Sequence, residues 1–453
     1  MNVVAGVRTV TNKRLNASAN LERPVLNRPF GFLQHKKAQE NPKGAKKRTP
    51  EMISVAEAIQ IVKQQTRPLA TERVKLEHAL NRVLAEDIVA DSDLPPFDRA
   101  QMDGYAVRAE DTAGAPVRLR IAGESAAGRG WHHELKSGHA VRIMTGAPVP
   151  AGADSVQQVE LTHELKDHTV VELLESVEAG RSIVKRGAEI QSGETVLQSG
   201  TPINGAMMAV LAAFGYAEVA VGQRPRVGVL ATGTELVSVT EKPGQDQIRD
   251  SNNYSIGAYA QLTGATVERL PLARDETSIL KKQIAGAAER CDVIVTSGGV
   301  SMGVYDVTKS ALEELKAEIF FERIALRPGK PTVFARLPNG TLVFGLPGNP
   351  VSVAVTFNLF ARTALLAMQG ATEPALKYET ALLARSVKGT VERESYLPAQ
   401  LTTNDDGELI AFPLKWGGSS DFVAFALTTA LVSVPAGTRS LEANALVRVL
   451  RLP

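Results

Sequence analysis

The sequence of 453 residues contains a single cysteine, Cys291. One thiol excludes an intramolecular disulfide, and it also excludes a cluster of cysteine ligands around zinc or an iron–sulfur centre. The sequence lacks any run of about 18 consecutive apolar residues, the length that a membrane-spanning helix requires. These two absences predict a cytoplasmic protein that does not span a membrane.

Charge is distributed unevenly along the chain. The first fifty residues contain eleven Lys and Arg against Glu22 and Glu40, a net +9 that leaves −7 for the rest of a chain whose total is +2. A basic segment with prolines and no apolar periodicity is typical of disordered chain, so we expect residues 1–51 to form a disordered basic extension. A transit peptide or a nucleic-acid-binding arm is the alternative. The acidic remainder argues against a nucleic-acid-binding protein.

The length and the apolar pattern predict an α/β multidomain protein. Apolar residues recur at helical spacing over residues 53–66, and short strands separated by glycine-rich turns follow. From residue 224, strands and helices alternate, which indicates a central three-layer domain with a mostly parallel sheet. We expect a basic extension 1–51, a discontinuous linker domain 52–92 and 183–223, a β-rich inserted domain 93–182, an α/β domain 224–370 and a C-terminal β domain 371–453.

The segment TSGGVSMGVYD, residues 296–306, follows an apolar strand and precedes a helical pattern. Gly298 and Gly299 allow a ligand to approach the backbone closely, and the unpaired amides of the helix start favour a phosphate. Asp306 could orient a hydroxyl or hold a hydrated divalent cation. It could equally cap the helix, as carboxylates at this position often do.

Further polar turns follow neighbouring strands of the predicted sheet. Residues 232–235 follow one strand and Arg274 and Asp275 another, so with the glycine turn they are expected at one sheet edge, where α/β proteins bind ligands. Cationic Arg323, Arg327 and Lys330 come next along the chain and would attract a polyanion.

The segment GLPGNPVS, residues 345–352, predicts a helix that begins at Pro350 with Asn349 as its cap. The amides around Val351 and Ser352 would then form a second anion site. The alternative is that Gly348 and the prolines only shape a tight turn.

Seven motifs occur in a fixed order: MDGYA, RIMTGAPVP, GTE, DSN, SGGVSMGVYD, RPGKP and GLPGNPVS. In this order and approximate spacing the chain resembles the MoeA-type molybdopterin molybdenumtransferases and the E domain of gephyrin, from Met52 to about the C-terminus. The resemblance implies that the α/β domain is of the molybdopterin-binding type. It also implies that molybdate and adenylylated molybdopterin are the substrates, that molybdenum cofactor and AMP are the products, and that Mg²⁺ assists.

The resemblance also assigns site residues. The implied catalytic residues are Asp103, Thr145, Glu189, Glu235, Asp275 and Asp306, of which Asp275 and Asp306 would hold the metal. The implied residues of the cofactor-binding site are Ser297, Gly298, Gly299, Ser301, Arg323, Arg327, Lys330, Pro347, Asn349, Pro350 and Ser352. Without the resemblance, Asp103 reads as a turn aspartate, Thr145 as a strand-end hydroxyl, and Glu189 and Glu235 as surface carboxylates.

A homodimer with a shared active site is implied, because in the family one subunit covers the strand edge of its partner. Transient contact with a molybdopterin adenylyltransferase and with apo-molybdoenzymes is also implied, and no contact with nucleic acid or membrane. Two other functions stay open: a molybdopterin adenylyltransferase, which would consume ATP, and a gephyrin-like scaffold, which would bind a receptor peptide.

The chain departs from the family pattern at several positions. Ala100 stands where serine often precedes MDGYA, and arginine stands at Arg323 and Arg327 where lysine is common. A planar guanidinium and a compact ammonium bind oxyanions differently. SSDF, residues 419–422, replaces a glycine-containing turn, which leaves Arg393 uncertain as an anion contact.

Overall fold

The computed structural model describes residues 52–165, 168–300 and 307–453. The basic extension 1–51 and the candidate residues Ser301 and Asp306 lie outside the described residues. The predictions made for them therefore stay predictions.

The chain leads into the β-rich region and returns from it along paired strands. β1 (Thr71–Lys75) pairs antiparallel with β12 (Glu218–Gly222), β2 (Ile88–Val89) with β11 (Thr195–Leu197), and β3 (Arg99–Ala100) with β10 (Ile183–Val184). The helices of this part are α1 (Val55–Gln65), η1 (Leu76–His78) and α2 (Gly205–Ala213). Ser54 caps α1, because its Oγ accepts a hydrogen bond from the Glu57 amide at 3.1 Å.

The β-rich region forms a six-stranded sheet in the order β7-β4-β6-β5-β9-β8. Its elements are β4 (Gly104–Val107), η2 (Ala109–Thr112), β5 (Val117–Ser125), β6 (His139–Ile143), β7 (Ser155–Gln158), η3 (Val159–Leu161), β8 (Thr162–Glu164) and β9 (Val170–Leu173). Gly104 starts β4 directly against β7, where an added Cβ would lie 1.9 Å from the Gln157 carbonyl oxygen. The glycine of MDGYA is therefore required by backbone packing.

The α/β region has a second six-stranded sheet, in the order β16-β13-β17-β21-β20-β18. The first four strands run parallel, and β20 and β18 are added antiparallel, so the predicted mostly parallel sheet is confirmed. The strands are β13 (Arg226–Ala231), β16 (Thr266–Arg269), β17 (Val293–Ser297), β18 (Glu318–Phe321), β20 (Val333–Arg336) and β21 (Leu342–Leu346). Two short strands, β14 (Leu236–Val237) and β15 (Ile248–Arg249), pair outside this sheet.

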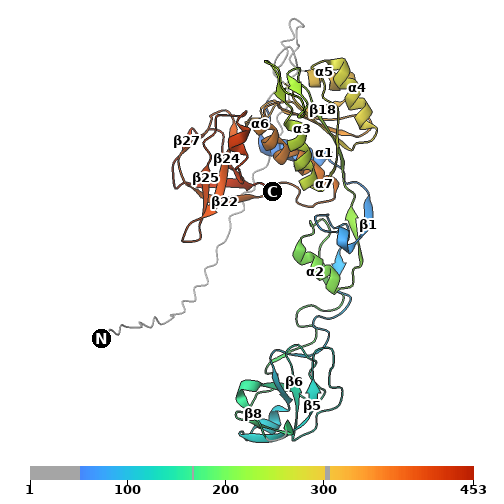
Figure 1. Cartoon of the computed structure of the whole chain (residues 1–453), viewed down its shortest axis with the longest axis vertical. Coiled ribbons are helices and arrows are strands. Elements are labelled where there is room, and N and C mark those ends of the chain that lie inside the picture. The colour runs from blue at the N-terminus through green and yellow to red at the C-terminus, as the bar shows by residue number, and fades with distance from the viewer. Residues whose placement is uncertain (1–51, 166–167, 301–306) are drawn as a thin grey trace, which may run out of the picture. The chain divides into compact units, whose positions relative to one another are not determined.

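Helices cover both faces of the sheet, as Figure 1 shows for α4 and α5 on one face and α3 and α6 on the other. Alternate residues of β17 explain this: Val293 and Val295 belong to the apolar cluster that contains Ile256 of α3, whereas Ile294 belongs to the cluster that contains Leu280 of α4. The helices are α3 (Asn252–Leu262), α4 (Thr277–Ala288), α5 (Val307–Glu314), α6 (Pro350–Thr356) and α7 (Arg362–Met368). A π-helical turn, Phe357–Ala361, joins α6 to α7.

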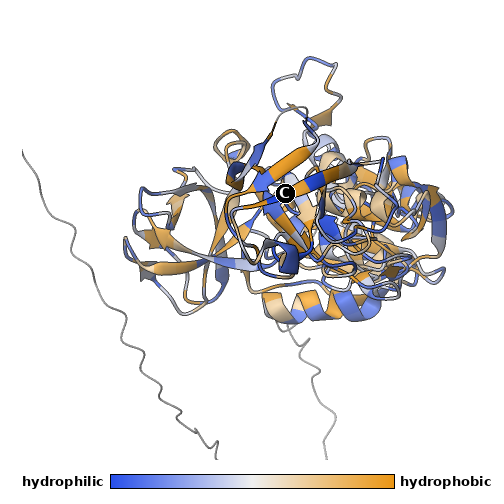
Figure 2. Cartoon of the chain, turned by 90° about the horizontal axis from the view of Figure 1, so that it is seen from below, coloured by the Kyte–Doolittle hydropathy of each residue, from blue (hydrophilic) through white to orange (hydrophobic). Residues whose placement is uncertain are grey.

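The helical stretch Pro350–Met368 is long and apolar enough to cross a membrane, but 83% of it is buried inside the protein. Figure 2 shows hydrophobic residues concentrated along helices and strands and hydrophilic residues in many of the connecting loops. The burial of most of the stretch Pro350–Met368 is typical of a core helix.

Cys291 is buried two residues before β17, and burial raises the pKa of its thiol to about 11. The thiol is therefore neutral near pH 7 and unsuited to act as a nucleophile or metal ligand.

The C-terminal strands close on themselves. β24 pairs with both β25 and β26, and the order β25-β22-β28-β26 completes a ring, which β19 of the α/β region extends by pairing with β24. The elements are β19 (Leu326–Arg327), β22 (Tyr378–Leu383), β23 (Val387–Lys388), β24 (Glu394–Thr403), β25 (Leu409–Pro413), α8 (Phe422–Phe425), β26 (Ala430–Val434), β27 (Ser440–Leu441) and β28 (Leu446–Arg451).

Gly104→Ala is expected to lower the free energy of unfolding by about 1–3 kcal/mol, because the new methyl group must displace the Gln157 backbone. Urea unfolding of the full chain measures this. Gly114→Ala in the same region is the matched control, since no atom lies within 4 Å of the point that an added Cβ would occupy. Equal stability of the two variants would contradict the packing role of Gly104.

Candidate active site

A pocket of about 780 Å³ lies at the carboxyl ends of β13, β17 and β21. Thr232 follows β13, Ser297 ends β17 and Pro347 follows β21, and all three line it. The other lining residues are Glu235, Leu236, Pro243, Gln247, Ile248, Arg249, Asp250, Ser251, Asn252, Asp275, Gly298, Gly299, Val300, Pro331, Gly348, Asn349, Pro350, Ser420 and Phe422. The polar turns after β13, β16 and β17 therefore meet at one sheet edge, as their order in the sequence predicts.

Glycine at position 298 allows these turns to approach one another. Gly298 has φ +93°, and a Cβ there would lie 2.2 Å from the Thr232 carbonyl oxygen. The Gly298 amide donates to the Leu346 carbonyl at 3.1 Å, and a Cβ at Gly348 would lie 3.6 Å from Gly298 Cα. A side chain at position 298 would not permit this packing of three strand ends.

Two residues that line the pocket each carry a buried polar atom without a partner among the described residues. These atoms are Ser297 Oγ and Asn252 Oδ1, in side chains that are 1% and 8% exposed and that line the pocket. Buried polar atoms are nearly always hydrogen-bonded in native proteins, and an exception calls for a ligand or ordered water.

The charged residues that line this pocket are mainly acidic: Glu235, Asp250 and Asp275 against Arg249. The predicted cations Arg323, Arg327 and Lys330 do not line it, although Pro331, next to Lys330, does. An anionic ligand in this pocket would therefore require a counter-ion or contacts with cations outside its described lining.

Asp275 is held by the turn after β13. Its Oδ1 accepts a hydrogen bond from Thr232 Oγ1 at 2.8 Å, and the Gly233 amide donates to the Ala273 carbonyl at 3.2 Å. Glu235 is exposed, and its carboxylate folds back over Gly233, where an added Cβ would lie 2.7 Å from both oxygens. Over residues 52–165, 168–300 and 307–453, no group of three or more His, Cys, Asp or Glu side chains is arranged to hold a metal ion.

Asn349 occupies the N-cap position of α6 as predicted, but its side chain does not act as a cap. α6 begins at Pro350 as expected, but the Asn349 side chain makes no capping hydrogen bond and donates to Ser419 Oγ at 2.9 Å. The Val351 amide donates to the Ser419 carbonyl at 3.1 Å, so this amide is not free for an anion. Ser352 is buried and does not line the pocket. Ser419 thus accepts hydrogen bonds from the Asn349 side chain and the Val351 amide, two groups that the sequence suggests as ligand contacts.

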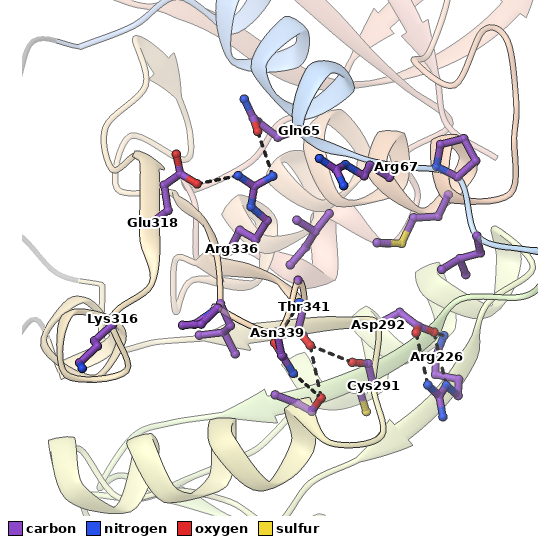
Figure 3. Close-up of a pocket in the computed structure, with 18 residues that line it drawn as sticks. Gln65, Arg67, Arg226, Cys291, Asp292, Lys316, Glu318, Arg336, Asn339 and Thr341 are labelled. Atoms are coloured by element: carbon purple, nitrogen blue, oxygen red, sulfur yellow. Dashed lines mark hydrogen bonds and ion pairs between the residues drawn. The ribbon is translucent and has the colours of Figure 1, made fainter.

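A second cavity of about 820 Å³ lies at the opposite, amino-terminal edge of the sheet (Figure 3). Four of its charged side chains form ion pairs with one another, Arg336 with Glu318 at 2.6 Å and Arg226 with Asp292 at 3.3 Å. Exposed Arg67 and Lys316 are ordinary surface cations. Because ligands of parallel α/β sheets bind at the carboxyl ends of the strands, we assign the site to the pocket near Ser297.

Asp103, Thr145 and Glu189 belong to the β-rich and linker regions and do not line the pocket near Ser297. Asp103 Oδ1 accepts from the Thr145 amide and from Thr145 Oγ1, each at 2.7 Å. These two bonds, the amide first, hold the pKa of the Asp103 carboxyl below its usual value. Glu189 forms an ion pair with Arg99 at 2.9 Å. Two candidates that are 42 residues apart in sequence thus form one exposed unit.

Three family models match the chain. The MoeA N-terminal region (domain I and II) matches residues 53–215, a "Probable molybdopterin binding domain" matches 228–367, and the MoeA C-terminal region (domain IV) matches 380–452. The molybdopterin molybdenumtransferase of Bacillus subtilis is 37% identical over 410 residues, which cover 89% of this chain and 94% of that protein. The chain belongs to the MoeA family.

Two other MoeA-family proteins are also similar to this chain over most of its length. The molybdopterin molybdenumtransferase of Staphylococcus aureus strain Mu50 is 35% identical over 408 residues, which cover 89% of this chain and 96% of that protein. A crystal structure of a MoeA protein from Pyrococcus horikoshii is 32% identical, with a TM-score of 0.71 over 88% of this chain and 99% of that chain. The match to the whole MoeA architecture, and not only to its α/β domain, explains why motifs lie on both sides of residue 224.

Some pocket residues of this MoeA-family chain were given no role from sequence. Asn252 and Asp250 lie in the DSN motif, whose position between a strand and a helix was the available signal. Asp250 is 4% exposed and accepts the Asn253 amide at 3.1 Å at the start of α3. Phe422 comes from the C-terminal region, more than a hundred residues from the strand ends of β13 and β17, so sequence spacing held no signal for it.

Thr145→Val is expected to raise the pKa of Asp103 part of the way towards its usual value, because the hydroxyl donor is lost and the amide donor remains. A carboxyl with a lowered pKa stabilises the folded state above its unfolded pKa, and that stabilisation disappears as pH falls through the folded pKa. NMR titration of the Asp103 side chain measures the change. Thr195→Val, at an exposed position on β11, is the control, and an unchanged Asp103 pKa in Thr145→Val would refute the assignment.

Proposed function

We propose that this protein inserts molybdenum into molybdopterin, taking adenylylated molybdopterin and molybdate and releasing molybdenum cofactor and AMP. The curated relatives that cover most of the chain are named molybdopterin molybdenumtransferases. The observation that carries the proposal is the pocket at the carboxyl ends of β13, β17 and β21, in which buried Ser297 Oγ and Asn252 Oδ1 lack partners among the described residues. Sites of this kind in α/β proteins bind ligands.

A divalent cation fits this pocket. Mg²⁺ is commonly held by one or two carboxylates together with substrate phosphates and water, and Asp275 presents a carboxylate whose Oδ1 is fixed by Thr232. When bound, Mg²⁺ would offset the negative charge of the phosphate oxygens. Asp306, from its position in the sequence, is the second ligand that the family resemblance suggests.

Arg323, Arg327 and Lys330 are proposed to attract molybdate. Within the described residues their side chains form no hydrogen bond or ion pair, so their charge is not neutralised by neighbours. The sulfur ligands of molybdenum would come from the dithiolene of the substrate, because the buried neutral Cys291 is unsuited to that role.

We further propose a cytoplasmic homodimer in which Asp103, Thr145 and Glu189 of one subunit complete the pocket of the other. The exposed Asp103–Thr145 unit, with its lowered carboxyl pKa, has the properties of an ionised group that is available to a partner. Transient contacts with a molybdopterin adenylyltransferase and with apo-molybdoenzymes would deliver the substrate and remove the product.

Asp275→Asn is expected to lower turnover at least about tenfold and to raise the Mg²⁺ concentration required, since it removes a proposed ligand. Purified protein, adenylylated molybdopterin, molybdate and Mg²⁺ are incubated, and released AMP and reconstituted molybdoenzyme are assayed. Asp405→Asn, at an exposed loop position of the C-terminal region, is the control. ATP consumption would instead identify an adenylyltransferase, and binding of a receptor peptide without any pterin would identify a scaffold.

Mixing the Asp103→Asn and Asp275→Asn variants after unfolding and refolding is expected to restore about a quarter of wild-type activity. In a mixed dimer one site receives both native carboxylates and the other receives neither, and half of the dimers are mixed. Each variant refolded alone is the control. No restoration, with dimers shown to exchange, would place all these residues in a single subunit's site or outside the site altogether.

A further inference from the structure

The turn of residues 144–147 carries Thr145, the partner of Asp103. It closes with a hydrogen bond from its last amide to its first carbonyl at 2.9 Å. Gly146 follows Thr145 with φ +80°, a left-handed conformation that glycine adopts without strain at the third position of a turn. Because Thr145 offers Asp103 Oδ1 both its amide and its hydroxyl, each at 2.7 Å, the position of this turn decides whether Asp103 keeps two donors.

Ser125, the last residue of β5, holds this turn from both ends. Its carbonyl accepts the Met144 amide at 3.1 Å, and its Oγ donates to the Pro148 carbonyl at 2.7 Å. The same Oγ accepts the Trp131 amide at 3.3 Å, so the hydroxyl both donates and accepts. Ser125 is 0% exposed, which shields these hydrogen bonds from bulk water and strengthens them.

The other side of the turn is held by backbone groups. The Ala100 carbonyl accepts the Gly146 amide at 2.9 Å, and the Ala100 amide donates to the Ala147 carbonyl at 3.0 Å. Among the described residues, the side chains that form hydrogen bonds with the turn and with the residue after it are those of Ser125 and Asp103. The Ser125 hydroxyl is therefore the side-chain support of the turn on the side away from Ala100.

Loss of the Ser125 hydroxyl would leave the Pro148 carbonyl and the Trp131 amide without this partner. A buried polar group without a partner is costly, so the segment would move until water or another group satisfies it. Pro148 directly follows the turn, and its movement would draw the Thr145 amide and hydroxyl away from Asp103. The geometry at Asp103 thus depends on a residue that does not touch it.

We infer that Ser125 is a positioning residue for the proposed reaction, whose buried hydroxyl fixes the turn of residues 144–147 so that Thr145 directs two hydrogen bonds to Asp103. This inference rests on the proposed function, in which Asp103 and Thr145 complete the pocket of the partner subunit. Ser125 lies outside the seven sequence motifs and acts on the reaction only through the turn.

Ser125→Ala in the full chain tests this role by two separate measurements. NMR titration of the Asp103 side chain is expected to show a pKa raised towards its usual value, because the two donors that lower it are displaced. In the AMP-release assay, kcat is expected to fall about tenfold, because a carboxylate in the wrong place supports turnover poorly. The KM for molybdate is expected to stay within about twofold, since Arg323, Arg327 and Lys330, which are proposed to attract molybdate, are not part of this turn.

Thr112→Val is the matched control, because it removes another buried hydroxyl of the β-rich region. Thr112 is 0% exposed, and its Oγ1 donates to the Ala109 carbonyl at 2.7 Å and accepts the Val177 amide at 3.0 Å. The thermal unfolding midpoint is expected to fall in both variants, whereas the Asp103 pKa and kcat are expected to change in Ser125→Ala alone. If Ser125→Ala does not fold, Ser125→Cys, which fills the same place with a weak donor, is measured with the same expectations.

An unchanged Asp103 pKa or an unchanged kcat in the folded Ser125 variant overturns the inference, and so does an equal change in Thr112→Val. Wild-type protein that releases no AMP from adenylylated molybdopterin in the presence of molybdate and Mg²⁺ overturns the proposed function instead. In that case a raised Asp103 pKa in Ser125→Ala still supports the control of the turn by Ser125, and an unchanged pKa overturns it.

Discussion

The contact of the Gly298 backbone with the Thr232 carbonyl is the constraint on which the pocket depends. Because no side chain fits at that contact, the turns after β13 and β17 meet directly, and the hydrogen bond from Gly298 to Leu346 brings in the end of β21. Three strand ends thereby form the floor of the pocket, and Ser297 and Asn252 are among the residues that line it. A side chain at position 298 would separate the strand ends that form this floor.

Local chemistry made much of the fold predictable from the sequence. The apolar run around Val295, followed by two glycines, predicts a buried strand and a tight turn, and the alternation of strands and helices predicts the mostly parallel sheet. Both predictions come from local sequence patterns, although the strands that pair in the sheet are far apart in the chain. Asn349 stands at the predicted cap position, but its side chain does not cap the helix and donates instead to Ser419, 70 residues further on. The pairing of Asp103 with Thr145 and the approach of Phe422 were unforeseen for the same reason, since each depends on long-range packing.

The charge of the pocket lining was not evident from the sequence. Arg323 and Arg327 are close in sequence to pocket residues, but the described lining carries mainly Glu235, Asp250 and Asp275. Which side chains face a cavity depends on the direction of each turn, and composition does not reveal it. An acidic pocket and an anionic substrate can coexist if a cation lies between them and if different parts of the pocket bind different parts of the ligand.

The antiparallel pairing of β3 with β10 places Ala100 opposite Ile183, so the chain enters and leaves the β-rich region at neighbouring points. A region whose two ends adjoin can be lengthened, shortened or exchanged during evolution without displacing the rest of the backbone. The same geometry offers protein engineers a natural graft point: a short hairpin joining those two residues would give a chain without the inserted sheet.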